Sequence, residues 1–509
     1  MALIALLTNN DDDVYCFRKE LIQAILSDGH DMIISCPDGP KFELMKEMNF
    51  IHDKLYIDRR GTNPIADWKL FLHYKKLFKK YRPDVVLTYT AKPNVYGSIA
   101  ARSLRIPVIN NVTGFGSVLN MGGLKRAMIT ALFKYAYRRS ACVMFQNSTN
   151  MELAQKSGMV YGECHLIPGS GIDTKRFPLQ DYPEGGDGKS GPPIIFNYIG
   201  RILHDKGVDD YIEAAKRIKK DFPNTEFNML GFIEPTEEAH YKPLLESLEK
   251  QEIINYHGSQ NDVKPYIVRA HALIHPSTYG EGMSNVLLEN ASSGRFLITT
   301  NNPGCQETVV DGKTGFIYSG GNVDKLVERI HKFLALPNSE RQLMGQKGRE
   351  YVKENFSRDI VIREYISEIK KLVKYKVGYT AGVYDMFHIG HLNVLKNAKD
   401  LCDYLIVAVS TDELVQEYKH KTPIIPFENR SKIVSAIRYV DKVIPQKDMD
   451  KKAAAVANRI NVMFVGDDWK GTGKWNNIQK ELNEIGIDVV YLPHTDGISS
   501  SMLREILKK

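Results

Sequence analysis

The feature that most limits how this chain can fold is a repeated alternation of short apolar runs with longer amphipathic stretches. In the first third of the chain, the apolar runs cover residues 4–7, 32–35, 85–88, 108–111 and 143–146. Apolar runs of this length, separated by helical patterns, are typical of βα units, in which helices cover both faces of a parallel sheet. The pattern therefore predicts an α/β fold built from Rossmann-like domains.

The alternation begins three times, which predicts three domains. Glycine, proline and small polar residues concentrate in residues 180–193, where we expect a linker, and a second series starts at residues 194–198. A helical pattern over residues 355–371 closes that series, and a third begins at Val377. A chain of 509 residues is expected to form about three domains. The predicted domains are residues 1–180, 192–372 and 374–509.

Composition and charge exclude several classes of protein. With 43% hydrophobic and 25% charged residues the chain is ordinary for a globular protein, and a net charge of +7 is too small for a dedicated nucleic-acid binder. The six cysteines contain no C-x-x-C pair, which argues against a zinc cluster or a disulfide framework. No apolar run approaches the ~20 residues of a bilayer span. We expect a cytoplasmic protein whose membrane contact, if any, is peripheral and at the inner face of the cell membrane.

Two segments of the first domain are predicted to form basic amphipathic helices, at residues 68–82 and 124–139. Anionic lipid headgroups attract such surfaces. A solvated lysine face, behind an apolar face packed on the core, explains the same pattern. The sequence leaves both interpretations open.

The second domain carries cations where ligands of α/β sheets bind. Arg201 and Lys206 follow the strand predicted at residues 194–199, and the carboxyl ends of such strands form the ligand crevice. A guanidinium fork and an ammonium point charge can together neutralise a nucleotide diphosphate. Alone, this spacing is weak evidence, because a surface ion pair uses the same residue types.

A second motif, Tyr279-Gly280-Glu281-Gly282-Met283-Ser284-Asn285, follows the strand predicted at residues 272–275. Its small residues allow close backbone approach, and a helix expected to begin near Ser284 would turn its free N–H groups toward the crevice. Glu281 would lie on the loop, and Glu289 about two turns into the helix. One carboxylate could then meet a sugar and the other a ribose.

Taken together, the G-R-x4-K and E-x7-E motifs resemble the retaining glycosyltransferases of family four, which have the two-domain GT-B architecture. The resemblance covers about residues 1–372 and includes Thr8-Asn9-Asn10, Lys92-Pro93-Asn94, Asn111-Val112-Thr113-Gly114-Phe115-Gly116 and Pro303-Gly304-Cys305-Gln306-Glu307. The sequence looks most like enzymes of capsule, O-antigen and other surface-glycan assembly. The resemblance implies a nucleotide-diphosphate sugar donor, by default a UDP-sugar, and a glycan or lipid-linked acceptor. It implies no cofactor for this step.

The resemblance also implies roles for individual residues. Arg201 and Lys206 would bind the donor diphosphate, Glu281 would contact the donor sugar, and Glu289 would bind the ribose. The remaining implied positions are Gly282, Ser284 and Asn285 on the donor side and Thr113 and Gly114 on the acceptor side. Because transfer in such enzymes is described without a protein nucleophile, stabilisation of the leaving diphosphate would be the main contribution of the protein.

The first loop departs from the glycine-rich pattern that is common among these relatives. It reads Asn9-Asn10-Asp11-Asp12-Asp13 instead, which leaves the acceptor side open. The aspartates could form a metal-binding D-x-D. A cap at a strand-to-helix junction explains them better, because GT-B enzymes generally need no bound metal for chemistry.

The third domain places two histidines at the predicted start of a helix, in the motif His388-Ile389-Gly390-His391. Imidazole N–H groups at a helix N-terminus can stabilise an α-phosphate under attack. For this motif alone, a structural histidine pair is an equal alternative.

The rest of the domain favours a catalytic role for the histidines, because approximately residues 374–509 resemble bacterial glycerol-3-phosphate cytidylyltransferases. By this resemblance His388 and His391 stabilise the pentacoordinate transition state. The residues implied to bind CTP and the alcohol phosphate are Gly382, Tyr384, Asp385, Lys419, Lys421, Arg438, Asp467, Asp468, Trp469, His494, Thr495, Gly497, Ile498, Ser499 and Ser500. Magnesium is expected with CTP, held by phosphates and water rather than by a protein cage. Relatives of this domain are often dimers, which favours a homodimer.

One residue departs from that family. His494 stands where relatives usually carry arginine, so a permanent cation becomes one that titrates near neutrality. Weaker nucleotide binding or a different phosphorylated alcohol could follow. The string H-I-G-H also occurs in class I aminoacyl-tRNA synthetases, but this chain has no K-M-S-K-S loop and no anticodon-binding region.

The sequence therefore predicts a bifunctional enzyme of capsule or teichoic acid biosynthesis. One half would transfer a sugar with retention, and the other would convert CTP and glycerol-3-phosphate to CDP-glycerol and pyrophosphate. Two alternatives remain for the third domain. It could act on phosphoethanolamine, phosphocholine or another polyol phosphate, or it could bind CTP without turnover.

Overall fold

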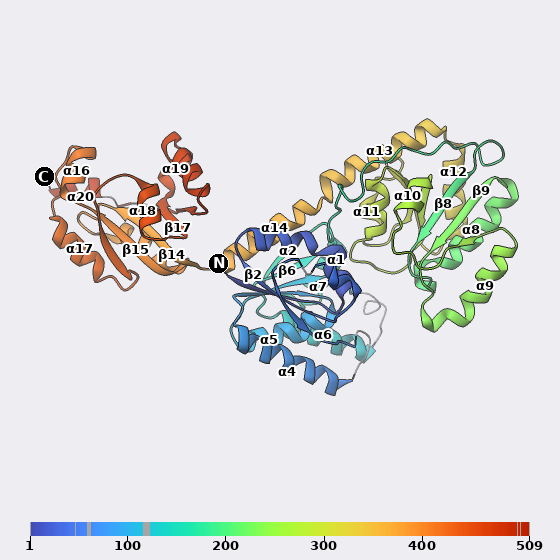
Figure 1. Ribbon diagram of the computed structural model, residues 1–509, viewed down its shortest axis with the longest axis horizontal. Coiled ribbons are helices and arrows are strands. Elements are labelled where there is room, and N and C mark those ends of the chain that lie inside the picture. The colour runs from blue at the N-terminus through green and yellow to red at the C-terminus, as the bar shows by residue number, and fades with distance from the viewer. Residues whose placement is uncertain are drawn as a thin grey trace. The chain divides into compact units, whose positions relative to one another are not determined.

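The computed structural model describes residues 2–45, 47–58, 63–115, 123–495, 497–498 and 500–507. The chain divides into two compact units, residues 2–369 and the part from residue 370 onward (Figure 1). The first unit contains two parallel sheets and the second contains one, with helices between the strands. This architecture confirms the predicted α/β class. In the described part of the chain, no helix is both long enough and apolar enough to cross a bilayer.

Seven parallel strands in the order β3-β2-β1-β4-β5-β6-β7 form the first sheet. They are β1 (Leu3–Leu7), β2 (Asp31–Cys36), β3 (Ile51–Lys54), β4 (Val85–Tyr89), β5 (Val108–Val112), β6 (Cys142–Phe145) and β7 (Glu163–Leu166). The helices are α1 (Asp11–Phe17), α2 (Lys19–Ser27), α3 (Pro40–Glu43), α4 (Pro64–Tyr81), η1 (Pro93–Gly97), α5 (Ser98–Ser103), α6 (Gly123–Tyr137) and α7 (Ser148–Lys156). On β1, Ile4 pairs with both Met32 of β2 and Val85 of β4. The strand order reverses there, at the kind of switch point where α/β sheets bind ligands.

Six parallel strands in the order β10-β9-β8-β11-β12-β13 form the second sheet. They are β8 (Ile194–Ile199), β9 (Thr225–Leu230), β10 (Asn255–Tyr256), β11 (Ala272–His275), β12 (Phe296–Thr300) and β13 (Gly315–Tyr318). The helices are η3 (His204–Lys206), α8 (Val208–Asp221), η4 (Pro235–Glu237), α9 (Glu238–Lys250), α10 (Lys264–Arg269), α11 (Asn285–Ser292), η5 (Gln306–Thr308), α12 (Val323–Ala335) and α13 (Asn338–Asn355). Phe196 pairs with Phe227 on one side and Ala272 on the other, so this sheet also reverses its order beside β8.

The segment between the two sheets is held against the second one. Arg295, fully buried, donates hydrogen bonds to the carbonyl oxygens of Gln180 (2.9 Å) and Asp181 (2.7 Å). Arg341 donates to the carbonyl of Gly186 at 3.1 Å. The composition of residues 180–193 predicted a linker, and the structure shows a connection fixed by two buried guanidinium groups.

After the second sheet the chain returns to the first. The helical pattern at residues 355–371 corresponds to α14 (Arg358–Leu372), which lies with α2 on one side of the first sheet while α4, α5 and α6 lie on the other (Figure 1). Arg358 forms an ion pair with Glu20, and Asn111 donates a hydrogen bond of 2.7 Å to the hydroxyl of Tyr365. The last helix of the first unit thus belongs to the first half by its contacts.

The second unit contains a five-stranded parallel sheet in the order β16-β15-β14-β17-β18. Its strands are β14 (Tyr375–Gly382), β15 (Cys402–Ser410), β16 (Lys442–Gln446), β17 (Val462–Gly466) and β18 (Asp488–Leu492). The helices are α15 (Ile389–Asp400), α16 (Asp412–Lys419), α17 (Phe427–Ser435), α18 (Lys451–Ala457), η6 (Asp467–Trp469), α19 (Gly473–Asn483) and α20 (Ser500–Leu507). The strand order reverses between β14 and β17, and β14 leads directly into the histidine motif.

Candidate functional sites

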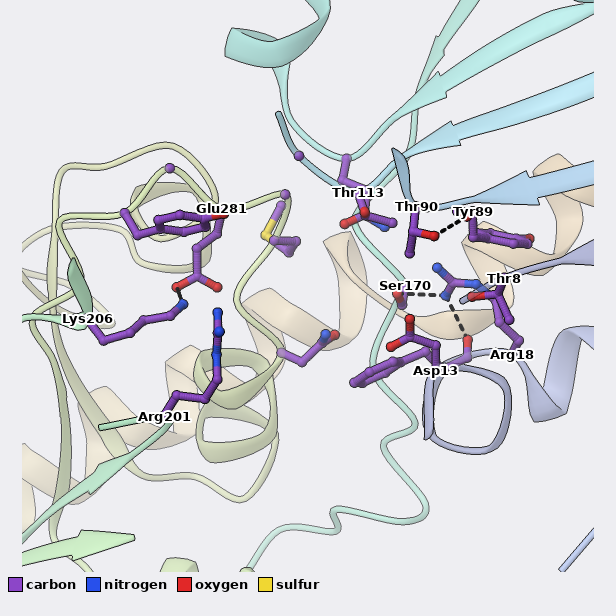
Figure 2. Close-up of a pocket in the computed structure, with 18 residues that line it drawn as sticks. Thr8, Asp13, Arg18, Tyr89, Thr90, Thr113, Ser170, Arg201, Lys206 and Glu281 are labelled. Atoms are coloured by element: carbon purple, nitrogen blue, oxygen red, sulfur yellow. Dashed lines mark hydrogen bonds and ion pairs between the residues drawn. The ribbon is translucent and has the colours of Figure 1, made fainter. Parts of the chain in front are cut away.

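The two cations predicted on the donor side lie after β8, on one wall of a cleft of about 300 Å³ in the first unit. Arg201 Nη1 is 3.3 Å from Glu234 Oε2, and Lys206 Nζ is 2.7 Å from Glu281 Oε1 (Figure 2). The Lys206 ammonium also lies over the ring of Tyr279, 5.2 Å from its centroid. The fold thus brings Lys206 and Glu281, which are 75 residues apart in the sequence, into one ion pair.

Glu281 is the centre of this polar cluster. His275, at the carboxyl end of β11, brings its Nε2 within 3.1 Å of Glu281 Oε1 and 3.2 Å of Ser284 Oγ. Burial would raise the pKa of Glu281, but Lys206 and His275 outweigh it and hold that pKa well below its usual range. The carboxylate is therefore ionised at neutral pH. His275 is a site residue that the sequence motifs did not indicate.

Close contact between the two halves explains why glycine occupies position 282. A Cβ at Gly282 would come within 2.1 Å of the carbonyl oxygen of Thr113. Gly114, opposite, has φ of +129°. Asn147 Nδ2 donates hydrogen bonds to the carbonyl oxygens of Glu281 (2.8 Å) and Gly282 (2.6 Å). The predicted donor loop and the predicted acceptor-side residues therefore meet at the cleft.

The cleft brings most of the predicted glycosyltransferase residues together. Those that line it are Thr113, Gly114, Arg201, Lys206, Glu281, Gly282 and Asn285. Ser284 is buried as the residue before α11 and faces His275. Glu289 is not among the lining residues and lies just over one turn into α11, not two, because the helix begins at Asn285. Burial raises the pKa of Glu289 to about 7 despite the opposing effect of Arg176, Arg358 and Lys264.

Several further lining residues come from the first half and were not predicted as site residues. They are Thr8, Asp13, Phe17, Arg18, Tyr89, Thr90, Gln146 and Ser170 (Figure 2). Thr8 and Thr90 follow β1 and β4, so the strand ends at the switch point could have indicated them. Arg18 lies after α1 and reaches the cleft only through tertiary folding. The aspartate triplet forms the first turn of α1, and the residue that caps this helix is Asn10, whose Oδ1 accepts a hydrogen bond of 2.7 Å from the backbone N–H of Asp12.

In the second unit, the glycine between the two histidines lets His388 fold over the start of α15. A Cβ at Gly390 would come within 2.9 Å of the His388 ring. Instead the backbone N–H of Gly390 donates to His388 Nδ1 at 3.1 Å. In the neutral imidazole the proton is therefore on Nε2, which lies 3.3 Å from Ser500 Oγ.

His391 stacks on His388, with ring centroids 3.9 Å apart. Burial lowers the pKa of His391 to about 4, with a further contribution from His388. Burial and the nearby His494 lower the pKa of His388 as well. Both imidazoles are thus neutral at pH 7.

The loop before the histidines is strained and tightly held. Tyr384 and Met386 have φ values of +54° and +47°, which non-glycine residues rarely adopt. Between them, Asp385 accepts hydrogen bonds from the backbone N–H groups of Ile424 (3.0 Å) and Ile425 (2.9 Å). Arg504 of α20 adds an ion pair of 2.6 Å to the same carboxylate. Asp385 is therefore occupied in fixing the loop.

The other predicted nucleotide residues divide into three groups. Lys419 and His494 lie near the histidine pair, because each lowers the pKa of one of its rings. Asp467 accepts a hydrogen bond of 3.0 Å from the backbone N–H of His494, and Thr495 accepts one of 3.1 Å from Asn393 on α15. Of the other predicted residues, Gly382 ends β14, Asp468 lies in η6, and Ser500 begins α20. Gly497 and Ile498 lie just before α20.

The third group is less closely tied to the histidines. Lys421 is exposed on the segment after α16, and Trp469 is 45% exposed. Arg438 donates a hydrogen bond of 2.7 Å to the hydroxyl of Tyr439, on the segment after α17. Ser499, also predicted, lies outside the described residues, as does Gly116 of the first-domain motif.

Two side-chain groups in the described residues have the donor types of a metal site. His275, Glu281 and Cys305 form one, but there the Glu281 oxygen is paired with Lys206. The other consists of Cys142, His165 and Glu368, away from the cleft. His165 lies 3.0 Å from Glu163 and 3.7 Å from Glu368. An ion-pair cluster between β7 and α14 accounts for this second arrangement.

Three known families match segments of this chain. Residues 186–351 match the family described as glycosyl transferases group 1, and residues 4–147 match the glycosyl transferase 4-like family. Residues 379–506 match the cytidylyltransferase-like family. The three matches together extend over most of the chain and cover both units.

The individual relatives match either the cytidylyltransferase-like part of the chain or the glycosyltransferase part. Glycerol-3-phosphate cytidylyltransferase of Bacillus subtilis is 40% identical over 138 residues, which is 27% of this chain and 96% of that protein. N,N'-diacetylbacillosaminyl-diphospho-undecaprenol alpha-1,3-N-acetylgalactosaminyltransferase of Campylobacter jejuni is 23% identical over 385 residues, 73% of this chain and 99% of that protein. The capsular polysaccharide biosynthesis glycosyltransferase CapM of Staphylococcus aureus is 25% identical over 327 residues, 63% of this chain and 85% of that protein.

A solved structure supports the fold of the first unit. HepE of Anabaena, in complex with UDP and glucose, superposes with a TM-score of 0.59 at 16% identity, over 73% of this chain and 100% of that one. The predicted GT-B architecture is thereby confirmed. Through residues 379–506 the chain belongs to the glycerol-3-phosphate cytidylyltransferase family, joined in one polypeptide to a GT-B glycosyltransferase of group 1.

Proposed function

We propose that the chain serves the assembly of a surface polysaccharide that contains a polyol phosphate. Its first unit would transfer a sugar from a UDP-sugar to a glycan or lipid-linked acceptor, with retention. Its second unit would make CDP-glycerol from CTP and glycerol-3-phosphate. The capsular and diphospho-undecaprenol relatives support the first activity, and 40% identity to a glycerol-3-phosphate cytidylyltransferase supports the second.

One observation carries the cytidylyltransferase activity: the tautomer of His388 is fixed at the start of α15. Because Nδ1 accepts from Gly390, the Nε2 proton is presented to a ligand together with the helix N-terminus. An oxygen of the alcohol phosphate would attack the α-phosphorus of CTP, and the bond from that phosphorus to the bridging oxygen would break, releasing pyrophosphate. His388 and His391 would stabilise the charge on the five-coordinate phosphorus.

Magnesium is proposed to enter with CTP rather than to reside in the protein. The Asp385 carboxylate is engaged by Arg504 and two backbone amides, and Asp467 Oδ1 accepts the backbone N–H of His494. Magnesium prefers oxygen ligands in octahedral geometry. These residues therefore do not fit a magnesium cage, and the triphosphate is the better ligand for the ion.

Pyrophosphate release from CTP tests this activity and separates the alternatives. Purified protein with magnesium would be assayed against glycerol-3-phosphate, other polyol phosphates, phosphoethanolamine and phosphocholine, with His388→Ala as control. We expect turnover with glycerol-3-phosphate that disappears in the variant. Turnover with a different alcohol only would assign a changed substrate, and CTP binding without any turnover would make the unit a sensing module, an option motivated by His494.

For the first unit, the ion pair between Lys206 and Glu281 carries the proposal. The pair would place a cation at the leaving diphosphate and a carboxylate at the donor sugar, while Arg201 adds a second cation. Release of UDP from a panel of UDP-sugars, with the anomeric configuration of the product read by NMR, tests both donor and stereochemistry. Product of inverted configuration would reject retention. Loss of turnover in Lys206→Ala is expected.

We also propose peripheral contact with the inner face of the cell membrane through α4 and α6. On α4, Ile65, Trp68 and Leu72 are 67%, 60% and 45% exposed and share one helix face. On α6, Met128 and Tyr135 are 64% and 51% exposed. The exposed basic residues of these helices and their ends are Lys69, Lys76, Lys79, Lys80, Arg126, Lys134, Arg138 and Arg139.

An apolar stripe within a basic face is the pattern of a helix that lies in a membrane interface. Cosedimentation with vesicles containing anionic lipid is expected to fall when Lys75, Lys76, Lys79 and Lys80 become glutamate. Unchanged binding would reject this surface. Dimerisation through the second unit is a separate proposal, which sedimentation equilibrium of the intact protein tests.

A further inference from the structure

Arg18 is a buried cation on the wall of the cleft that faces the donor residues. It lies between α1 and α2 and is 6% exposed, yet it lines the cleft. Figure 2 shows its guanidinium beside Ser170, Thr90 and Thr8, across the cleft from Arg201 and Lys206. The position places a permanent positive charge on the acceptor side.

Among the described residues, no carboxylate forms an ion pair with Arg18. Nη1 donates to the carbonyl of Phe17 (2.9 Å) and to the hydroxyl of Ser170 (2.7 Å). The guanidinium carbon lies 4.3 Å from the ring centroid of Tyr89, and Nε is buried without a hydrogen-bond partner among the described residues. Asp13 lines the same wall, but Figure 2 draws no ion pair between it and Arg18.

Other buried arginines of the chain are satisfied more fully. Arg295 donates from all three nitrogens to backbone carbonyls, and Arg341 does the same. Arg358 and Arg430 each have a carboxylate partner, Glu20 and Asp412. Arg18 differs from these four because, among the described residues, only its Nη1 donates hydrogen bonds, and both acceptors are neutral oxygens.

A buried guanidinium cannot relieve its cost by losing a proton, so its N–H groups require acceptors, and an oxyanion is the strongest acceptor available. The negative charge of the donor diphosphate is met on the opposite wall by Arg201 and Lys206. We propose that Arg18 binds a phosphate oxyanion of the acceptor substrate. This inference rests on the proposed glycosyltransferase function and adds the chemical class of the acceptor. The phosphate could belong to a sugar-diphosphate lipid or to a polyol-phosphate chain, which share the same oxyanion.

Kinetics with matched acceptors test the inference and distinguish the two sources. Three acceptor types would be compared: sugar 1-diphospho-farnesyl compounds, octyl glycosides of the same sugars, and glycerol-phosphate oligomers. In Arg18→Gln we expect KM for whichever phosphorylated acceptor is used to rise about 30-fold or more, as for loss of a charge-assisted contact, with about twofold change for octyl glycosides. Lys19→Gln, which removes a charge one residue away and outside the cleft lining, is the matched control.

A binding measurement keeps the test independent of transfer and of folding. Inorganic pyrophosphate would be titrated into intact protein saturated with UDP, so that the donor diphosphate site is already filled. Binding by the second unit is the same in wild type and variants, because no substitution lies there. Wild type and Lys19→Gln should show a pyrophosphate site that Arg18→Gln lacks and Arg18→Lys weakens. UDP affinity should stay within about twofold in all variants, which also reports an intact fold.

Two results would overturn the inference: identical pyrophosphate isotherms in wild type and Arg18→Gln, or a loss of UDP affinity as large as the loss of pyrophosphate, which would assign Arg18 to the donor. Failure of the proposed function has a different signature. No UDP-sugar would then be transferred to any acceptor, while the pyrophosphate titration would still report on Arg18.

Discussion

Glu289 is expected, from the family resemblance, to bind the donor ribose, and its protonation state would then affect donor binding. Its pKa is raised to about 7, mainly by burial, so the folded protein holds a proton there in the lower part of the neutral range. A carboxylate accepts hydrogen bonds from both ribose hydroxyls, whereas the protonated acid accepts fewer. Donor binding should therefore favour the ionised form and release a proton.

Affinity for a UDP-sugar, whose diphosphate has no group that titrates in this range, should accordingly rise about tenfold between pH 6 and pH 8, because the ionised fraction of one group with a pKa near 7 changes by that factor. The sign follows from the raised pKa: the binding form is lost as pH falls through 7. Calorimetric titration across this range measures it. In Glu289→Gln the pH dependence should disappear, and an affinity independent of pH in the wild-type protein would contradict the assignment.

Residue types at fixed spacing were enough to predict Arg201, Lys206 and Glu281 as neighbours, because strand ends and a helix start bring those positions to one crevice. Arg18 and His275 could not be predicted in this way. Arg18 reaches the cleft because α1 packs beside the strand ends, and His275 acquires its importance from contact with Glu281. Neither relation is encoded by local spacing.

At the scale of elements, the start of α15 depends on the missing side chain of Gly390. In Gly390→Ala, the new Cβ would displace the His388 ring, which lies within 2.9 Å of its position. Pyrophosphate release should fall at least about tenfold, consistent with the loss of one positioned catalytic donor. The measurement is kcat/KM with CTP and the active alcohol phosphate.

Gly473→Ala is the matched control, since Gly473 also opens a helix of the same unit but its Cβ would meet nothing within 4 Å. That variant should keep its activity and gain up to about 1 kcal/mol of stability, because alanine loses less backbone entropy in a helix. Equal activity in both alanine variants would show that the His388 position does not matter for turnover.

The connection between the two sheets depends on a buried arginine. Arg295→Met would leave the carbonyls of Gln180, Asp181, Ala270 and Ser293 without their donor. We expect a loss of about 3 kcal/mol in the free energy of unfolding of the first unit, seen as a lower melting temperature in calorimetry. Arg217→Met, which removes a side chain 42% exposed, should lower the melting temperature far less, because exposed ion pairs contribute little to stability. Similar shifts in both variants would refute the argument.

Periodicity predicted the strands of the first two sheets except the edge strands β3, β7, β10 and β13, and in the third sheet it predicted only β14. It also misjudged a segment whose structure depends on distant partners. Residues 180–193 have the composition of a flexible linker, yet Arg295 and Arg341, more than 100 positions later, fix the segment in place.

On the scale of the whole molecule, the two units are compact separately, which makes their coupling testable. Residues 1–372 and 373–509 produced as two chains should each retain activity, because the whole of α14 and its contacts with the first half then remain in the first chain. Glycan output in cells is expected to fall if the fused chain channels CDP-glycerol. Equal output from separate and fused chains would reject channelling and leave coordinated expression as the benefit of fusion.

The chain crosses between the halves of the first unit twice, and the two crossings touch. Ile172 on the outward path donates a backbone hydrogen bond of 2.7 Å to Phe356 on the return path, and Arg358 donates one of 3.0 Å back to Ile172. A single connecting segment would let the donor half rotate in any direction. Two connecting segments joined by hydrogen bonds form a hinge that bends about one axis and resists twisting. The two halves should therefore open and close about this one axis, so that Glu281 returns to the same position relative to Thr113 at each closure.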